Sequence, residues 1–123
     1  MNELRFTKDH EWLRLDSDGL VTIGITDHAQ DQLGDVVFVQ LPEVGAVFSA
    51  GDEAVVIESV KAAGEIHLPA AGKVVAVNSA LADEPATVNE DPHGEGWFLR
   101  VQLDDPGVLG RLMDETAYRA FLG

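Results

Sequence analysis

The feature that most constrains the fold of this chain is a series of short segments rich in β-forming residues, each bounded by a turn signal. Runs of about five such residues between clusters of Gly, Pro, Asp or Ser are typical of β-strands. The predicted strands are Glu11–Leu15, Leu20–Ile25, Asp35–Gln40, Ala54–Val60, Glu65–Leu68, Lys73–Val77 and Gly96–Leu103. Their regular spacing predicts a mostly β fold, either a sandwich or a barrel.

Capping residues predict three short helices around this β body. Thr26 or Asp27 offers a side-chain oxygen to start the first helix, and Gly34 ends it. Asp105, followed by a proline, predicts the start of the second, and Asp114 predicts the start of a C-terminal helix. The apolar residues expected to face the core are Leu109, Leu112 and Met113 in the second helix and Tyr118, Phe121 and Leu122 in the third.

Two segments of the chain resemble each other at an offset of 21 residues, Ala50–Val56 and Ala71–Val77, and Lys61 lies close to the midpoint between them. The similarity is either a coincidence in a Val-rich chain or the sign of two pseudo-symmetric hairpins with a lysine at the central tip. Periodicity alone does not predict a turn at Lys61, because no Gly, Asn or Pro lies there. It would place the break at Ala63-Gly64 instead.

Composition excludes several classes of function. The net charge of −14 argues against binding to nucleic acid or to anionic membranes, which require clustered Lys and Arg. The chain has no cysteine, so it has no disulfide and no thiolate of its own. No apolar run approaches the ~20 residues of a membrane helix. The first fifteen residues carry three acidic side chains and resemble neither a signal peptide nor a transit peptide, so we expect a cytoplasmic protein.

The residues that carry enzyme or metal chemistry elsewhere form no recognisable site here. His10 and Glu11 begin like a zinc-protease helix, but Arg14 occupies the position of the second histidine ligand. The acidic loop Asn89–Gly94 is weakly similar to a calcium loop, yet its twelfth position is Arg100 and not a bidentate acid. The histidines, in no ligand spacing, are His10, His28, His67 and His93. We therefore predict no catalytic residue and no metal site.

Lys61 is the one residue with a distinctive context. The chain has only three lysines, Lys8, Lys61 and Lys73, and small residues follow Lys61 at Ala62 and Ala63. A primary amine on a long stem suits an amide link to a carboxylic acid cofactor, and small neighbours leave room for a modifying enzyme. On local context alone, a solvated lysine without a special role is the more common interpretation.

Six motifs, in order along essentially the whole chain, resemble those of the H proteins of the glycine cleavage system. They are His10-Glu11-Trp12, Gly24-Ile25-Thr26-Asp27-His28-Ala29-Gln30, Leu33-Gly34-Asp35-Val36-Val37-Phe38-Val39, Leu41-Pro42-Glu43-Val44-Gly45, Glu58-Ser59-Val60-Lys61-Ala62 and Gly96-Trp97-Phe98. Such a set in register is specific to this family of lipoyl carriers.

The resemblance implies that Lys61 carries lipoate in amide linkage. Its recognition context would be the neighbouring residues Glu58, Ser59, Val60 and Ala62. The implied fold is a single lipoyl-carrier domain over residues 1–123, a β-sandwich of the lipoyl/biotinyl barrel-sandwich hybrid type with short peripheral helices. The loaded arm of the family folds into a surface cleft near the segment matching His10-Glu11-Trp12, so Glu11 is a candidate for docking that arm.

The resemblance also implies partners and a role without catalysis of its own. The family carries an aminomethyl group from glycine decarboxylase to a tetrahydrofolate-dependent aminomethyltransferase, and presents the dithiol to dihydrolipoamide dehydrogenase. Lipoylation enzymes would be further partners. The chemistry would then belong to the cofactor, and the protein would supply position.

Several alternatives remain open at the level of the sequence. A biotin carrier would be expected to flank its lysine with methionines, and a 2-oxo acid dehydrogenase domain with a preceding acid, but Val60 and Ala62 flank Lys61. A role in relaying lipoyl groups to other acceptors, or a non-carrier β interaction domain with a bare lysine, would also accommodate much of this pattern.

Overall fold

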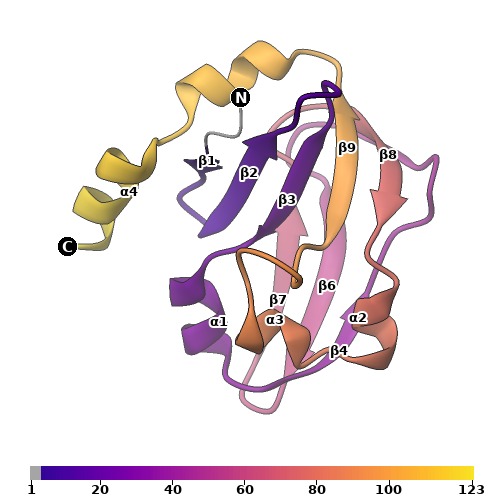
Figure 1. Ribbon diagram of the computed structural model, residues 1–123, viewed down its shortest axis with the longest axis vertical. Coiled ribbons are helices and arrows are strands. Elements are labelled where there is room, and N and C mark those ends of the chain that lie inside the picture. The colour runs from indigo at the N-terminus through magenta and orange to yellow at the C-terminus, as the bar shows by residue number, and fades with distance from the viewer. Residues whose placement is uncertain (1–3) are drawn as a thin grey trace.

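Two antiparallel sheets that share one apolar core form the body of the protein (Figure 1). The computed structural model describes residues 4–123. The larger sheet has the strand order β1 (Leu4–Phe6), β2 (Glu11–Leu15), β3 (Val21–Ile25), β9 (Leu99–Leu103), β8 (Gly72–Val77) and β5 (Val47–Phe48). The smaller sheet has the order β4 (Val36–Gln40), β6 (Glu53–Ser59) and β7 (Ala63–His67). The prediction of a mostly β sandwich is confirmed.

Both sheets bury apolar side chains in the space between them. Alternating residues of β9 are buried at Leu99, Val101 and Leu103, as the two-residue period of a half-buried strand requires. Ile57 of β6 and Ile66 of β7 contribute from the smaller sheet. One continuous core therefore fixes the position of the β6–β7 hairpin relative to the larger sheet.

Short helices occupy the ends of the sandwich. They are α1 (Asp27–Leu33), α2 (Ala80–Asp83), α3 (Thr87–Glu90), the 3₁₀ helix η1 (Pro106–Arg111) and α4 (Glu115–Leu122). The predicted caps are confirmed, because Thr26, Asp105 and Asp114 each accept a hydrogen bond from a backbone N–H of the first turn. The second predicted helix is a 3₁₀ helix, in which Leu109 is buried.

Trp12 anchors a second apolar cluster on the outer side of β2. Its side chain is fully buried, and its indole Nε1 donates a hydrogen bond to the carbonyl of Pro92 at 2.9 Å. Gly24 lies opposite Trp12 in the β2–β3 ladder. A Cβ atom at position 24 would lie 2.6 Å from the indole ring, so only glycine leaves room for the tryptophan.

The C-terminal helix corrects one prediction. Tyr118 is buried and stacks on Phe6 with ring centroids 4.5 Å apart, but Phe121 and Leu122 are 51% and 40% exposed. The prediction that all three are buried is wrong, because α4 contacts the body mainly beside β1 and otherwise projects from it (Figure 1). Only one face of this eight-residue helix has a partner within the part of the chain described.

Several small elements were not predicted from the sequence, namely β1, β5, α2 and α3. The last strand is also shorter than predicted, because residues 92–96 form turns and β9 begins only at Leu99. None of the helices within residues 4–123 has the length and apolar character to cross a membrane.

The two similar segments found in the sequence lie in different sheets, one in β6 and one in β8. Their glycines have different roles. Gly51 adopts a positive φ of 86° in the turn before β6, whereas Gly72 lies so close to β9 that a Cβ atom would be 2.9 Å from the carbonyl of Gln102. The two segments nevertheless lie on either side of the β6–β7 turn, which contains Lys61.

Candidate functional site

Lys61 lies in the exposed turn between β6 and β7, which forms one end of the molecule (Figure 1). Strand β6 ends at Ser59 and β7 begins at Ala63, so the turn comprises Val60, Lys61 and Ala62. All three turn residues are exposed. The amine is therefore presented at the tip of a hairpin, where another protein can approach it.

The hydroxyl of Ser59 holds this turn together in place of the usual turn residues. It accepts hydrogen bonds from the backbone N–H groups of Ala62, at 3.0 Å, and Lys61, at 3.4 Å. It lies 2.6 Å from the carbonyl of Leu33 and 2.8 Å from that of Ala62, and either carbonyl can accept its one proton. A serine that organises its own following turn in this manner supplies what Gly, Asn or Pro would otherwise provide.

The segment between α1 and β4 supports the tip from outside the hairpin. The backbone N–H of Val60 donates to the carbonyl of Asp35 at 3.0 Å. Gly34 has a positive φ of 77°, and a Cβ atom there would lie 2.7 Å from Cε of Lys61. The aliphatic stem of Lys61 thus lies across Gly34, which needs to be glycine both for its backbone conformation and for this close approach.

The remaining predicted context residues gather at the same tip. Glu58 is exposed and pairs with Phe38 on β4 and Ala63 on β7. Val60 and Phe38 are 67% and 48% exposed, unusual values for large apolar side chains. The tip therefore offers a primary amine beside one acidic and two apolar side chains, a combination suited to recognition by a protein partner.

Glu11 lies elsewhere, in an open cavity of about 400 Å³. The twelve residues that line this Glu11 groove are Phe6, Thr7, Lys8, Asp9, Glu11, Gly51, His67, Leu68, Pro69, Arg111, Leu112 and Met113. Glu11 is only 2% exposed overall. One carboxylate oxygen accepts from the hydroxyl of Thr7 at 3.2 Å and the other from the backbone N–H of His67 at 2.9 Å. Burial raises the pKa of Glu11 from 4.5 to about 7.

The Glu11 groove combines an apolar wall with a buried acid, and Lys8 and Arg111 also line it. Its apolar wall includes Leu68, Leu112 and Met113, and its buried acid can exchange a proton near neutral pH. His67 connects this groove to the lysine tip, because it ends strand β7, which begins next to the Lys61 turn. The two regions thus lie at opposite ends of one strand.

Two groups of acidic residues with His67 bring possible ligand atoms within 4.8 Å of one another in the part of the chain described. They are Asp9, Glu11 and His67, and Glu53, Glu65 and His67. Glu11 already uses both carboxylate oxygens as hydrogen-bond acceptors, and the other acids are exposed. Exposed acidic groups of this kind are insufficient for a metal site, so the absence of a metal stays a prediction.

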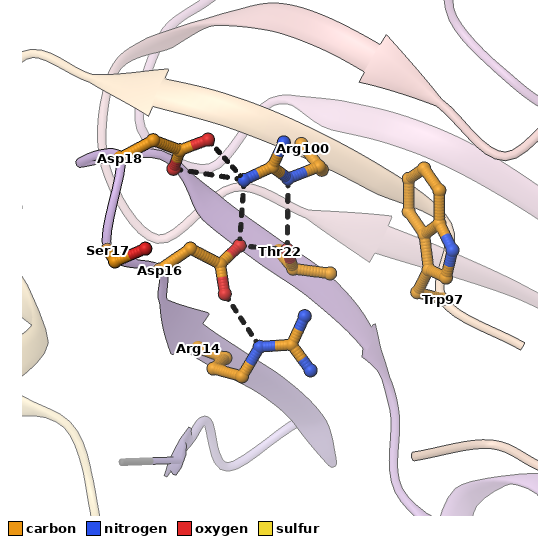
Figure 2. A pocket seen from close by; sticks show the side chains of 7 residues that line it. All are labelled: Arg14, Asp16, Ser17, Asp18, Thr22, Trp97 and Arg100. Carbon is orange, nitrogen blue, oxygen red and sulfur yellow. Dashed lines mark hydrogen bonds and ion pairs between the residues drawn. The ribbon is translucent and has the colours of Figure 1, made fainter. Parts of the chain in front are cut away.

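A further cavity, of about 530 Å³, is lined by an ionic network that contains two arginines. Figure 2 shows these side chains and the contacts between them. Arg100 bridges Asp16 and Asp18 at 3.0 and 2.8 Å, while Arg14 contacts Asp16 at 2.7 Å. Thr22 donates to Asp16 and accepts from Arg100. Each guanidinium is engaged by an acid, so this network serves to tie the β2–β3 turn to β9.

The structure brings Lys61 together with its four predicted context residues but leaves Glu11 in a separate groove. Sequence reasoning missed two residues behind the tip, Gly34 and Asn89. Gly34 was interpreted as the end of a helix and as part of a family motif, and Asn89 only as part of a failed calcium loop. A glycine aligned with the family motif was the one available signal, because nothing local connects Asn89 to a hairpin about thirty residues earlier.

Comparisons with known proteins agree over nearly the whole chain. The family model described as glycine cleavage H-protein matches residues 4–123. The chain is 57% identical to the glycine cleavage system H protein of Parvibaculum lavamentivorans and 59% identical to that of Methylocella silvestris, covering 99% of this chain and 97% of each relative. A crystal structure of an H protein from Mycobacterium marinum superimposes with a TM-score of 0.87 at 41% identity, covering 98% of this chain and 96% of that one.

Proposed function

Because this chain belongs to the glycine cleavage H-protein family, the lipoyl carriers of the glycine cleavage system, we propose that it carries a lipoyl group on Lys61 and has no catalytic activity of its own. The observation that supports this most is the presentation of Lys61 at an exposed tip whose shape is fixed by Ser59 and by residues 33–35. The match to the solved structure also confirms the predicted barrel-sandwich fold. The shared core supports a single carrier domain over residues 1–123.

The residues around Lys61 fit a covalently attached lipoyl group. Lys61 is exposed and is followed by the small Ala62, so a modifying enzyme can reach its amine. When bound, a lipoyl group supplies a disulfide that accepts and releases an aminomethyl cargo and is restored by oxidation of the dithiol. The protein's part is to present the amide-linked arm and to orient it toward each partner.

The direct test of this proposal is the mass of the protein purified from its own host. We expect the mass of one lipoyl group in excess of the polypeptide, located by peptide mapping on the fragment that contains Lys61. A lipoyl group on Lys8 or Lys73, or none in cells that are making lipoylated proteins, would refute the proposed attachment.

The implied partners are glycine decarboxylase, the aminomethyltransferase, dihydrolipoamide dehydrogenase and the lipoylation enzymes, and we propose a cytoplasmic setting for their encounter. The surface near Lys61 suits electrostatic docking. Asp31, Asp35 and Glu58 are all exposed on the elements that form or support the tip. Together with the net charge of −14, they favour partners with a basic rim around the active-site entrance.

We expect association with at least one of these enzymes to slow as salt rises from low to physiological concentration and above. Salt screens the long-range attraction that steers acidic and basic surfaces together. Stopped-flow association rates measure this effect directly. Replacing Asp35 with Asn and Glu58 with Gln should weaken the salt dependence, and rates unaffected by salt with every partner would contradict it.

We further propose that Glu11 receives the amine at the end of the loaded arm. His67 lies six positions after Lys61, at most about 20 Å of extended strand. A lipoyl-lysine arm of about 10–15 Å covers most of this distance, so its end can meet the near side of the Glu11 groove. With its pKa raised to about 7 by burial, Glu11 can give a proton to a neutral amine and remain beside the resulting ammonium.

Replacing Glu11 with glutamine should leave lipoylation of Lys61 intact but hasten formaldehyde release from aminomethyl-loaded protein. A protonated amine has no lone pair with which to expel the sulfur, so losing the carboxylate that favours this form should shorten the lifetime of the loaded protein. The measurement is formaldehyde release at neutral pH. Glu65→Gln, an exposed acid on β7 near His67, is the matched control and should decay like the unaltered protein. Equal decay of Glu11→Gln would exclude this role.

A further inference from the structure

Asn89 is the residue behind the lysine tip that the proposed function does not yet use. It lies on α3 and is half-buried, and its side chain makes three hydrogen bonds, all to α1 and the segment after it. Its Nδ2 donates to the carbonyl of Gly34 at 2.8 Å and to Oε1 of Gln30 at 3.0 Å. Its Oδ1 accepts from the backbone N–H of Val36 at 2.8 Å. Asn89 thus fixes both sides of the turn between α1 and β4.

The carbonyls of this turn point alternately toward Asn89 and toward the hairpin tip. Gly34 directs its carbonyl to Asn89, whereas Leu33 and Asp35 direct theirs to the Ser59 hydroxyl and the Val60 N–H. We call residues 33–36 the bracket. The Val36 N–H shares a rigid peptide plane with the Asp35 carbonyl, so Asn89 fixes the direction of that carbonyl directly. The Leu33 carbonyl shares its plane with the Gly34 N–H, which donates to the carbonyl of Gln30 at 3.0 Å, and Asn89 also bonds the Gln30 side chain.

We infer that Asn89 is a positioning residue for the modification of Lys61, acting through the bracket to hold the tip in the shape that the lipoylating enzyme accepts. The inference rests on the proposed attachment of lipoate to Lys61. The tip contains no Gly, Asn or Pro, and Ser59, which organises it, is itself bonded to the Leu33 carbonyl, while the Val60 N–H is bonded to the Asp35 carbonyl. Its conformation therefore depends in part on partners outside the hairpin. A tip that samples several conformations would present the amine correctly only part of the time.

The experiment measures initial rates of lipoylation by a lipoate–protein ligase supplied with lipoate and ATP. In that reaction the Lys61 amine loses a proton and forms an amide with the lipoate carboxyl carbon, as the bond between that carbon and the adenylate oxygen breaks. Asn89→Asp keeps the size and the acceptor for the Val36 N–H, but loses the two donated hydrogen bonds and places an oxygen opposite the Gly34 carbonyl. We expect its kcat/KM to fall roughly ten- to a hundred-fold.

Asn78 provides a matched control. Its Nδ2 donates two hydrogen bonds of 2.8 Å to the carbonyls of Glu95 and Trp97, and it is likewise half-buried, but it has no bond to the bracket or the tip. Asn78→Asp therefore loses the same kind of contacts and should be lipoylated at the wild-type rate. Amide hydrogen exchange at Val60 should accelerate in Asn89→Asp and stay unchanged in Asn78→Asp, a difference that a general loss of stability would not produce.

Each outcome decides the inference. If wild-type protein takes no lipoyl group on Lys61, the proposed attachment itself fails. If wild type is modified and Asn89→Asp is modified equally fast, or if both asparagine variants slow equally, only the role of Asn89 is refuted. Should Asn89→Asp not fold, Ser59→Ala breaks the bracket's contact from the tip side and should show the same slow lipoylation and fast exchange at Val60; a wild-type rate in that variant would overturn the inference.

Discussion

Lys61→Arg is expected to fold like the unaltered protein, to accept no lipoyl group and to support no glycine turnover in the reconstituted system. Arginine keeps the charge and most of the stem, but its guanidinium remains protonated at any physiological pH and does not form the amide. The side chain is exposed at the tip, so few stabilising contacts are at stake. Intact mass, glycine turnover and the urea midpoint measure the three expectations separately.

Lys73→Arg is the matched control, since Lys73 is also an exposed lysine and lies in β8, away from the tip. It should be lipoylated and active like wild type. Residual activity in Lys61→Arg would show that the amine of Lys61 is not the attachment point. An unfolded Lys61→Arg protein would instead show that the stem across Gly34 contributes more to stability than its exposure indicates.

Glu11→Gln is expected to stabilise the protein above pH 7 by on the order of 3 kcal/mol and to change its stability little at pH 4. Burial raises the pKa of Glu11 from 4.5 to about 7, so the folded state retains a proton that the unfolded state releases within that window. The free energy of unfolding of wild type therefore falls as pH rises through this range. Glutamine has no proton to release and avoids the loss, which urea unfolding at the two pH values measures.

Asp16→Asn is expected to change the stability of the protein in the opposite direction. Burial alone would raise the pKa of Asp16, but hydrogen bonds from Thr22, Arg14 and Arg100 outweigh it and hold the pKa below its usual value. This carboxylate therefore stabilises the fold above the unfolded pKa, and the benefit is lost as pH falls further. Asp16→Asn should destabilise the protein at pH 8, where Glu11→Gln stabilises it. A Glu11→Gln protein no more stable than wild type at pH 8 would mean that Glu11 ionises at an ordinary pH.

A buried acid that lowers stability at working pH is unexpected in a small domain unless it has a function. The Thr7 hydroxyl and the His67 N–H stabilise the charge only in part, since burial outweighs them. Protein sites that combine local destabilisation with chemical competence are commonly functional. The two Glu11→Gln experiments therefore complement each other. If the variant is more stable but its loaded arm is shorter-lived, then Glu11 lowers the stability of the fold while it protects the loaded arm.

The regular parts of the fold were accessible from the sequence because their signals are local. The alternation in β9 and the caps at Thr26, Asp105 and Asp114 depend on residues within a few positions of one another. The exposure of Phe121 was not accessible in this way. An apolar stripe on a helix indicates which face prefers burial, but not how much of that face another element covers.

The candidate site was accessible only in part. The resemblance located Lys61 and its neighbours, whereas the local signals placed the turn at Ala63-Gly64. The partners that hold the turn at Lys61 come from the bracket, some 25 residues earlier in the chain, and Asn89 lies 28 residues later. The burial of Glu11 was missed for a related reason, because an acid near the start of an exposed-looking strand is normally solvated.

The origin of the tip's shape also has a consequence for how the protein matures. A peptide copying only the β6–β7 hairpin would lack the bracket carbonyls and should be a poor substrate. During synthesis, the bracket itself is complete only after Asn89 has left the ribosome and α3 has formed beside α1. Attachment of the prosthetic group should therefore follow folding, so that incomplete or misfolded chains remain unmodified and do not compete with functional carriers for the partner enzymes.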